Sequence, residues 1–589
     1  TNNEYTMPHR YLPLCGKDGY DTGTAIDKAV NLADIHSKYL LFLDDDTSRL
    51  NNRNFVRNMV QLLETKPNAG GTVCKMLSKN RNKVVEAGNI VWNDASTTAI
   101  SGDSGVDIGE SKVSYARPID YGSGSCLMVK KDIVQGYRAL NRNNFDNYYG
   151  DADLQLYIQH GIGKEIWFQP SAVAIKAKSE SKANDENAVN YLKDRWKDQL
   201  QTKHLPPPHS ITDKHENEIH HMKASDLRAR DTSKAKILWL EQAAPNPDNG
   251  SGFGRSFDSL SIVSELGHRI TLLLQQQVTD SWCDERCQKR ISDLGVEMIS
   301  AGDWHEYAAT YIDFYDIVYV SRPTTFEMAY EELQKLYEKH PFTLIYDCEG
   351  LWYARDEMLI SHVTMKYSFF NIVNYQKFPG GVERFALSTK SDDIDIEFAQ
   401  LDIKHGRKVE QKLIQMADTV LTASERETQA VLRALPNTTI YTAGHTMSID
   451  EATIASTEFS QRCGILFLGS FDGGMYYNGD AVWYFINEVY PLVLMEWKTS
   501  SDPIQLTIAG RGIPKSLKDF VAKGEVLMKN IVFHEITDAA DIQDLYRSAR
   551  IFIAPHQYGA GIQYEVSKAF SFGVPVVMSS FTADSFRIK

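Results

Sequence analysis

Three consecutive aspartates at the end of an apolar run have the residue types and spacing for metal chemistry. The run Tyr39-Leu-Leu-Phe-Leu is short and partly aromatic, which favours a buried strand, and it leads directly into Asp44, Asp45 and Asp46. Side chains alternate along a strand, so Asp44 and Asp46 face one way and Asp45 the other. Paired carboxylates at the carboxyl end of a strand suit Mg²⁺ or Mn²⁺, which in turn suits a diphosphate. A solvated acidic loop or a helix N-terminus would use the same residues.

A second acidic pair and a glycine-containing loop follow. Asp151 and Asp153 fall in Tyr148-Tyr-Gly-Asp-Ala-Asp-Leu, in the first turn of an expected helix, where acidic residues commonly act as caps. The loop Gly122-Ser123-Gly124 precedes an apolar strand. Its glycines allow the backbone to approach a ligand closely.

These residues need strands and helices to position them. The pattern predicts an amphipathic helix within 17–38, a helix over 54–65 and a strand over 70–77. After Lys234, strands at 235–240, 269–274, 317–320 and 343–346 alternate with helices, and a glycine-rich loop covers 245–254. A second series has strands at 464–471, 504–509, 531–534, 551–554 and 574–578. This order predicts two doubly wound parallel sheets with a ligand site between them.

Composition excludes several classes of protein. The 589 residues are 42% hydrophobic and 24% charged, as in ordinary globular proteins of several domains. No apolar run reaches the roughly 18 residues of a membrane span. The net charge of −14 argues against a nucleic-acid partner. Seven scattered cysteines, with Cys283 and Cys287 the only close pair, favour a reducing cytosol over a disulfide scaffold.

Residues 201–233 differ from their surroundings. They contain Pro206-Pro-Pro and five of the sixteen histidines, His204, His209, His215, His220 and His221, among charged residues. A metal-binding tract is one interpretation, but the spacing does not support it, and we predict a linker. The chain begins with Thr1 and stops at Lys589, just after an apolar strand that lacks its helix. This indicates a fragment cut at both ends.

Several motifs of the N-terminal region occur in a recognisable order. They are Leu41-Phe-Leu-Asp-Asp-Asp-Thr, Val85-Glu-Ala-Gly-Asn-Ile-Val-Trp, Asp120-Tyr-Gly-Ser-Gly-Ser-Cys-Leu, Tyr148-Tyr-Gly-Asp-Ala-Asp-Leu and Trp167-Phe-Gln-Pro. Together they resemble a family 2 glycosyltransferase of the GT-A fold. The resemblance implies that Asp44 and Asp46 bind Mg²⁺ or Mn²⁺ and that Asp151 is the general base of an inverting reaction. It also implies that Gly122, Ser123, Gly124 and Asp153 line the acceptor or donor loop.

The C-terminal region resembles a second family. Tyr346-Asp-Cys-Glu-Gly-Leu-Trp-Tyr-Ala-Arg-Asp, Phe467-Leu-Gly-Ser-Phe, Asn478-Gly-Asp-Ala and Ala554-Pro-His-Gln-Tyr-Gly-Ala-Gly look like a family 4 glycosyltransferase of the GT-B fold, which uses no metal. The residues implied to bind the nucleotide sugar are Gly469, Ser470, Arg511, Tyr558, Gly559, Ala560, Gly561, Glu565 and Lys568. Relatives carry Lys at the place of Glu565 and Glu at the place of Lys568. The inverted pair is three residues apart, and we predict a helical ion pair.

We therefore expect an α/β protein. A GT-A nucleotide-diphospho-sugar transferase domain (1–200), a linker (201–233) and a GT-B pair of Rossmann-like doubly wound lobes (234–445 and 446–589) would follow one another. The expected activity transfers a sugar from a nucleotide-diphosphate sugar to a hydroxyl of a growing glycan, of cell-surface polysaccharide or O-antigen type. The acceptor would be a glycan or lipid-linked glycan, and the location the cytoplasm, with room for association at the inner face of the membrane. Alternatives are a metal-dependent nucleotidyltransferase, or one active GT-A module with a degenerate GT-B scaffold.

Overall fold

The structure is a computed structural model. It describes residues 32–34, 36–43, 47–50, 54–134, 150–176, 186–247, 251–300, 304–339, 341–364, 371–377, 383–388, 396–446, 458–471, 476–497, 504–523, 528–536 and 539–588. The chain divides into two compact units. The first comprises Thr1–Lys236, Val263–Thr271 and Glu285–Ile299; the second comprises Ile237–Ile262, Leu272–Asp284 and Ser300–Lys589.

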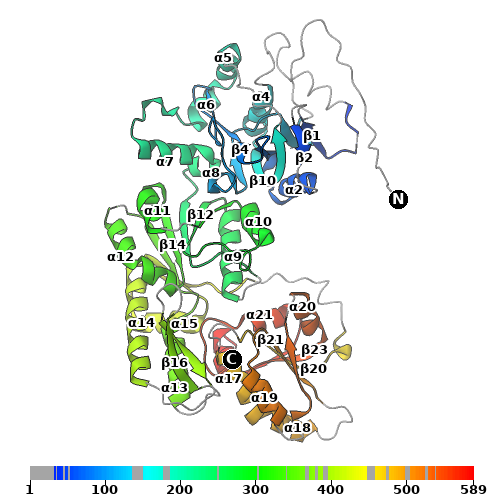
Figure 1. Cartoon of the computed structure of the whole chain (residues 1–589), viewed down its shortest axis with the longest axis vertical. Helices are drawn as coiled ribbons and strands as arrows, with labels where there is room; N and C mark the ends of the chain where they lie inside the picture. The colour runs from blue at the N-terminus through cyan, green and yellow to red at the C-terminus, as the bar shows by residue number, and fades with distance from the viewer. Residues whose placement is uncertain are drawn as a thin grey trace. The chain divides into compact units, whose positions relative to one another are not determined.

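A mixed sheet forms the centre of the first unit (Figure 1). Its main path is β1 (Tyr39–Leu43), β9 (Cys126–Lys130), β3 (Ala69–Leu77), β10 (Glu165–Lys176) and β2 (Thr47–Leu50). β9 runs antiparallel to both β1 and β3, whereas β10 runs parallel to β3. The short strands β4 (Lys83–Glu86), β7 (Val106–Asp107) and β8 (Arg117–Ile119) pair beside this path, and β5 (Asn89–Val91) pairs with β6 (Thr97–Ala99). The expected strand 70–77 is confirmed as β3.

Helices on this sheet bury the faces that the sequence pattern indicates. Helix α2 (Phe55–Thr65) buries Phe55, Met59, Leu62 and Leu63, as the apolar spacing predicts. The other helices are α3 (Lys131–Val134), α4 (Gly150–Leu156), α5 (Glu186–Arg195), α6 (Lys197–Lys203), α7 (Lys214–Ser225), α8 (Leu227–Arg230) and α10 (Glu285–Leu294). A π-helical turn over Tyr157–Gly161 extends α4.

The segment 201–233, expected to be a linker, is folded into the first unit. It contains the end of α6, the 3₁₀ turn Pro208–Ser210, α7 and α8. Ala224 is fully buried in the core, and the His220 ring stacks on Trp92 with ring centroids 5.4 Å apart. The sequence did not predict this packing because only a few small or aromatic residues of a charged, histidine-rich segment make the contacts. No group of three His, Cys, Asp or Glu residues suited to a metal occurs in the described ranges.

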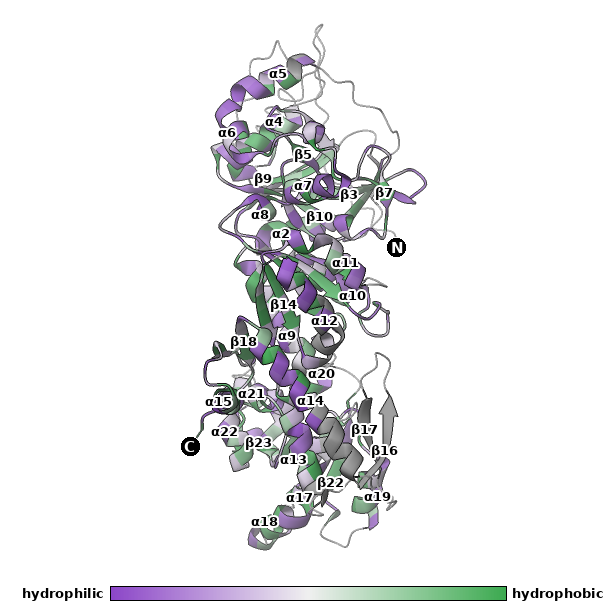
Figure 2. Ribbon diagram, turned by 90° about the vertical axis from the view of Figure 1, so that its left-hand side faces the viewer, coloured by the Kyte–Doolittle hydropathy of each residue, from purple (hydrophilic) through white to green (hydrophobic). Residues whose placement is uncertain are grey.

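A seven-stranded sheet follows, ordered β13 (Val296–Ser300), β12 (Arg269–Leu274), β11 (Lys236–Glu241), β14 (Ile317–Ser321), β15 (Thr343–Asp347), β18 (Thr419–Thr422) and β19 (Ile440–Thr442). The ladders from β11 through β14, β15 and β18 to β19 are parallel. Figure 2 shows the strands around β14 in the green of hydrophobic residues, as expected for parallel strands covered on both faces. The helices are α9 (Ser251–Glu265), α11 (Trp304–Tyr311), α12 (Pro323–Lys339), α13 (Trp352–Thr364), α14 (Ile396–Met416) and α15 (Glu425–Ala434), and β16 (Asn371–Lys377) pairs with β17 (Glu383–Ser388).

A five-stranded parallel sheet forms the C-terminal lobe of the second unit. Its order is β22 (Ile531–Glu535), β21 (Leu506–Gly510), β20 (Cys463–Leu468), β23 (Ala549–Ala554) and β24 (Val576–Met578). Two apolar clusters, one containing Phe467 and Ile508 and the other Leu466 and Phe552, form its core. The helices are α17 (Tyr476–Tyr484), α18 (Tyr490–Glu496), α19 (Lys515–Lys523), α20 (Ala539–Ser548), α21 (Tyr564–Ser571) and α22 (Ser580–Ser585). Both predicted strand series are confirmed.

Two further features concern the environment of the chain. Cys283 and Cys287 are disulfide-bonded, whereas the scattered cysteines were interpreted as reduced; Cys74, Cys126, Cys348 and Cys463 are free thiols. Within the described ranges, every helix is too short or too polar to span a bilayer.

Candidate functional site

The first unit brings the carboxyl end of β1, the loop 122–125 and the acidic pair of α4 to one edge of its sheet. Leu43, the last residue of β1, pairs with Cys126, the first residue of β9, so the carboxyl end of β1 lies beside the end of the loop 122–125. Thr47 Oγ1 donates to the carbonyl oxygen of Ser125 at 3.0 Å. Asp44 and Asp46 themselves lie outside the described residues. Their flanking residues nevertheless adjoin the loop 122–125.

The glycine loop is held by helix α4. The Gln155 side chain accepts from Gly122 N at 2.9 Å and donates to Gly122 O at 2.6 Å. Asp151 Oδ2 accepts from Gly124 N at 2.7 Å. A Cβ atom on Gly122 would lie 2.5 Å from Val73 Cγ1, so close packing alone requires this glycine. Ser123 Oγ contacts Ser125 Oγ at 2.8 Å.

The two acidic residues of α4 have different environments. Asp153 is 2% exposed, and its carboxylate accepts from Arg195 Nη1 at 2.8 Å and from Trp196 Nε1 at 2.9 Å. Asp151 is half-buried, and its oxygens accept only backbone N–H groups in the bonds described, from Gly124 and Ala152. Asp153 therefore stabilises the fold, and Asp151 is the carboxylate that remains accessible at the loop.

A buried ion pair behind this loop was missed by the sequence analysis. Arg230 donates to both carboxylate oxygens of Asp120, at 2.8 and 2.7 Å, and His204 Nδ1 lies 3.5 Å from the same group. Burial alone would raise the pKa of Asp120, but Arg230 and then His204 lower it below its usual value. Burial and the neighbouring His204 lower the pKa of His160 to about 4. Arg230 is 110 positions from Asp120 in the sequence, so no local signal could have indicated the pair.

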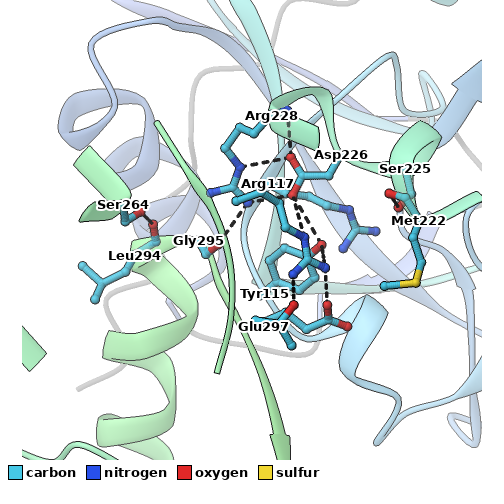
Figure 3. Close-up of polar contacts among 12 residues, drawn as sticks. Tyr115, Arg117, Met222, Ser225, Asp226, Arg228, Ser264, Leu294, Gly295 and Glu297 are labelled. Atoms are coloured by element: carbon cyan, nitrogen blue, oxygen red, sulfur yellow. Dashed lines mark hydrogen bonds and ion pairs between the residues drawn. The ribbon is translucent and has the colours of Figure 1, made fainter. Parts of the chain in front are cut away.

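A second buried charge cluster lies where residues 115–117 and 226–228 meet residues 295–297 of the same unit (Figure 3). Arg228 binds Asp226 at 2.7 Å and donates to Gly295 O at 3.0 Å. Arg269 forms an ion pair with Glu297 and also approaches Asp226 at 4.0 Å. Asp226 is fully buried. Through Gly295 and Glu297, residues 285–299 thus help to hold the buried charges of the first unit.

The C-terminal sheet of the second unit reverses its order between β20 and β23. Such a switch point, at the carboxyl ends of parallel strands, is where open α/β sheets bind ligands. Gly469 and Ser470 follow β20, and the segment 555–561 follows β23. Asn478 Nδ2 donates to Ser470 O at 2.6 Å, and Asn478 Oδ1 lies 2.8 Å from His556 Nε2. Nε2 of His556 is therefore the protonated nitrogen, and burial lowers the pKa of His556 to about 4.

The predicted glycine loop lies at this point. Gly561 has a φ of +65° that favours glycine, and Tyr558 Oη donates to Asp480 Oδ2 at 2.6 Å. Gly561 N donates to Glu427 Oε1 at 2.8 Å. Glu427 is 4% exposed, and burial raises its pKa. One backbone N–H of the loop that the resemblance assigns to the nucleotide sugar is thus bonded to a carboxylate.

The remaining predicted residues follow β21 or belong to the loop 558–561 and to helix α21. One contact predicted among them does not form. Arg511 follows β21, and its carbonyl oxygen accepts from Phe471 N at 2.9 Å. Ala560 lies between the two loop glycines. Glu565 and Lys568, both on α21, do not form the predicted ion pair: Lys568 Nζ lies 6.0 Å from the centroid of the Tyr564 ring. Burial raises the pKa of Glu565.

The seven-stranded sheet carries an ionic network at the carboxyl ends of β11, β14 and β15. Arg255 Nη1 binds Asp347 Oδ2 at 2.6 Å, and Tyr319 Oη donates to the same oxygen at 2.6 Å. Arg322 Nη1 lies 3.6 Å from Glu241 Oε1. Burial raises the pKa of Glu241, although Arg322 opposes the shift. Asp347 lies in the motif that begins at Tyr346, but no local pattern in the sequence indicates a role for it or for its partners.

Residues 462–586 match the family model described as glycosyl transferases group 1. No curated protein matches the chain. Similar solved structures include HepE of Anabaena in complex with UDP and glucose (TM-score 0.37, 11% identity, covering 59% of this chain and 81% of HepE). Others are sucrose-phosphate synthase of Thermosynechococcus elongatus (0.37, 12%, 60% and 83%) and a glycosyltransferase from Rickettsia africae (0.36, 12%, 59% and 79%).

Proposed function

We propose that the chain is a glycosyltransferase that transfers a sugar from a nucleotide-diphosphate sugar to a hydroxyl of a growing glycan. The observation that carries this proposal is the family match of residues 462–586, which includes both loops at the β20–β23 switch point. The donor would bind there, with its diphosphate near Gly469, Ser470 and the loop 558–561. Arg511, on the neighbouring strand end, supplies a positive charge for the diphosphate.

A second transfer site in the first unit is part of the same proposal. Asp44 and Asp46 have the hard oxygen ligands that suit Mg²⁺ or Mn²⁺, and such an ion would neutralise a leaving diphosphate. Asp151 would accept the proton of the acceptor hydroxyl. The hydrogen bond that Gly124 N donates to Asp151 Oδ2 at 2.7 Å orients this carboxylate. The side chain of Gln155 holds the loop through Gly122. Acceptors of the polysaccharide or lipid-linked type remain part of the proposal.

The test is donor turnover by the full chain. We would incubate it with UDP-, GDP- and ADP-sugars and measure release of the nucleoside diphosphate, with water or added glycans as acceptor, in Mn²⁺ and in EDTA. Asp44→Asn and Asp46→Asn should abolish the metal-dependent part, and turnover in EDTA should come from the second unit. Turnover of no sugar nucleotide in either condition would refute the proposal.

Two observations favour a different role for the C-terminal lobes. Glu427 already binds Gly561 N, where a ligand phosphate was expected, and the charges at 565 and 568 are inverted relative to the family. A scaffold that binds glycan without turnover would tolerate both features. Calorimetric titration with UDP, GDP and ADP separates the two roles, because an enzyme site should bind one of them and a scaffold should bind none.

A further inference from the structure

A buried carboxylate on α15 holds the glycine loop of the C-terminal lobe from outside that lobe. Glu427 lies in the first turn of α15 and is 4% exposed. Its Oε1 accepts from Gly561 N, in the loop after β23, at 2.8 Å and from Leu351 N, between β15 and α13, at 2.9 Å. Its Oε2 accepts from the hydroxyl of Ser424, the N-cap of α15, at 2.9 Å. Three charge-assisted hydrogen bonds thus fix this carboxylate and join two parts of the second unit.

The turn that Glu427 binds, residues 349–351, is itself held from two sides. Glu349 has a left-handed backbone (φ +53°), and its carboxylate accepts from Arg322 Nε at 2.7 Å. Glu410 accepts from the first two N–H groups of α13, at 3.3 and 3.1 Å. Together with Glu427 it satisfies N–H groups at the start of this helix, where negative charge is stabilised. The bond from Leu351 N therefore ties Glu427 to a fixed part of the fold.

Close packing joins the same two segments. A Cβ atom on Gly350 would lie 2.9 Å from Ala560 Cβ and 3.0 Å from Gly561 N. A Cβ atom on Gly561 would lie 3.3 Å from the carbonyl oxygen of Glu349. Residues 349–351 and 560–561 are therefore in backbone contact, and glycines on both sides make room for it.

The other end of the loop is held within the C-terminal lobe. Tyr558 Oη donates to Asp480 Oδ2 at 2.6 Å, and both side chains are buried. The loop 558–561 is thus fixed at Tyr558 by its own lobe and at Gly561 by Glu427. Loss of the second bond would leave the first intact.

We propose that Glu427 is a positioning residue of the second unit, which holds the donor loop 558–561 against the turn 349–351; this inference rests on the proposed function. Gly561 N is then an attachment point of the loop and not a ligand of the diphosphate, which the other groups at the β20–β23 edge bind. A donor on this loop keeps one position relative to the turn. The bond of Gly561 N to a carboxylate is accordingly compatible with an active site.

Two substitutions break this attachment in different ways. Glu427→Ala removes the oxygen that accepts from both backbone N–H groups. Gly350→Ala places a methyl carbon 2.9 Å from Ala560 Cβ and leaves the carboxylate unchanged. Glu427→Gln is the conservative variant, because both N–H groups donate to one oxygen and an amide oxygen can accept from them as well.

The assay separates positioning from folding. We would measure nucleoside diphosphate release in EDTA, in the full chain carrying Asp151→Asn to silence the first unit, and titrate each variant with UDP, GDP and ADP. Glu427→Ala and Gly350→Ala should each reduce turnover about 10²-fold, as a displacement of about 1 Å can do. Nucleotide affinity should stay unchanged, because the start of the loop keeps its bond within the C-terminal lobe. Glu427→Gln should retain turnover.

Two control variants should retain both turnover and affinity. Arg426→Gln alters the neighbouring residue of α15, which also contacts the C-terminal lobe but does so at Phe581, whose carbonyl oxygen accepts from Arg426 Nη1 at 3.2 Å. Gly406→Ala adds a methyl group where a Cβ atom meets nothing within 4 Å. A loss of turnover in Arg426→Gln equal to that in Glu427→Ala would contradict a specific role of the loop attachment.

Thermal unfolding checks each fold, and Gly350→Ala covers the case in which Glu427→Ala fails to fold. Full turnover by either of these variants, or an equal loss of turnover and nucleotide affinity, overturns this inference while the proposed function stands. Glu427→Gln as inactive as Glu427→Ala overturns it as well. A parent chain that binds nucleotide but turns over no donor overturns the inference together with second-unit activity, and absence of both binding and turnover refutes the proposed function itself.

Discussion

Asp151 and Asp153, on one helical turn, should respond in opposite ways to the same substitution. Asp153→Asn leaves the Arg195 charge without its buried partner, so we expect a loss of about 3 kcal/mol of unfolding free energy. Asp151→Asn removes only bonds to backbone N–H groups at a half-buried position, and we expect a change within about 1 kcal/mol.

Metal-dependent turnover should fall about 10²–10⁴-fold in Asp151→Asn, because a general base is lost. Thermal unfolding and nucleoside diphosphate release, measured on both variants, check this prediction. If Asp153→Asn were stable and inactive while Asp151→Asn stayed active, the general base would be Asp153 and not Asp151.

Glu410 should make the chain less stable as pH rises towards neutrality. It is 2% exposed and accepts from Trp352 N at 3.3 Å and Tyr353 N at 3.1 Å. Burial raises its pKa from 4.5 to about 8. Between these two values the unfolded chain releases a proton that the folded chain retains, so the free energy of unfolding falls with pH, by at most about 1.4 kcal/mol per unit, and levels off above about 8.

Glu410→Gln keeps an acceptor oxygen but cannot ionise, so its stability should depend less on pH between 5 and 8. Thermal unfolding at several pH values measures this. Glu357→Gln is the matched control, because Glu357 forms an exposed pair with Arg407 and should keep the parent's pH dependence. An unchanged slope in Glu410→Gln would contradict the assignment.

At the scale of elements, the sequence predicted regular structure well and long-range support poorly. The strands from 235 and from 464 were predicted because buried parallel strands leave continuous apolar runs such as Ile-Leu-Trp-Leu. The glycine loops were found because their spacing is local. Helices α7 and α8 were taken for a linker, since few apolar residues mark their buried sides. Asp120–Arg230 and Arg322–Glu349 join residues that only the fold brings together.

The Asp120–Arg230 pair shows that α8 supports the glycine loop of the first unit. Arg230→Gln would leave the fully buried Asp120 carboxylate with fewer partners, and we expect a loss of about 3 kcal/mol or more. Lys214→Gln on α7 is the control, because that lysine side chain is 92% exposed and its pair with Glu218 should contribute little. Chemical denaturation of both variants measures the difference. Equal stability would mean that His204 compensates for the arginine.

At the scale of the molecule, the first unit is not continuous in sequence. Asp226, Arg228 and Tyr115 are buried with residues 269 and 295–297, which come after the start of the next sheet. A fragment of residues 1–233 would lack Gly295 and Glu297, so Asp226 and Arg228 would be exposed and Arg228 would lose the carbonyl oxygen to which it donates. We expect this fragment to unfold at a lower temperature than any transition of the full chain, or to aggregate. A fragment as stable as the first transition of the full chain would show that residues 285–299 contribute little.

The paired hydrogen bonds between Gln155 and Gly122 have a consequence for the loop's accessibility to solvent. The side-chain amide binds both the N–H and the carbonyl of one glycine, as a neighbouring strand would. The Gly122 amide proton is therefore shielded although it belongs to no strand. In deuterated water it should be replaced only when α4 pulls away from the loop, so the rate at which this single proton is lost reports how often that edge of the first unit opens.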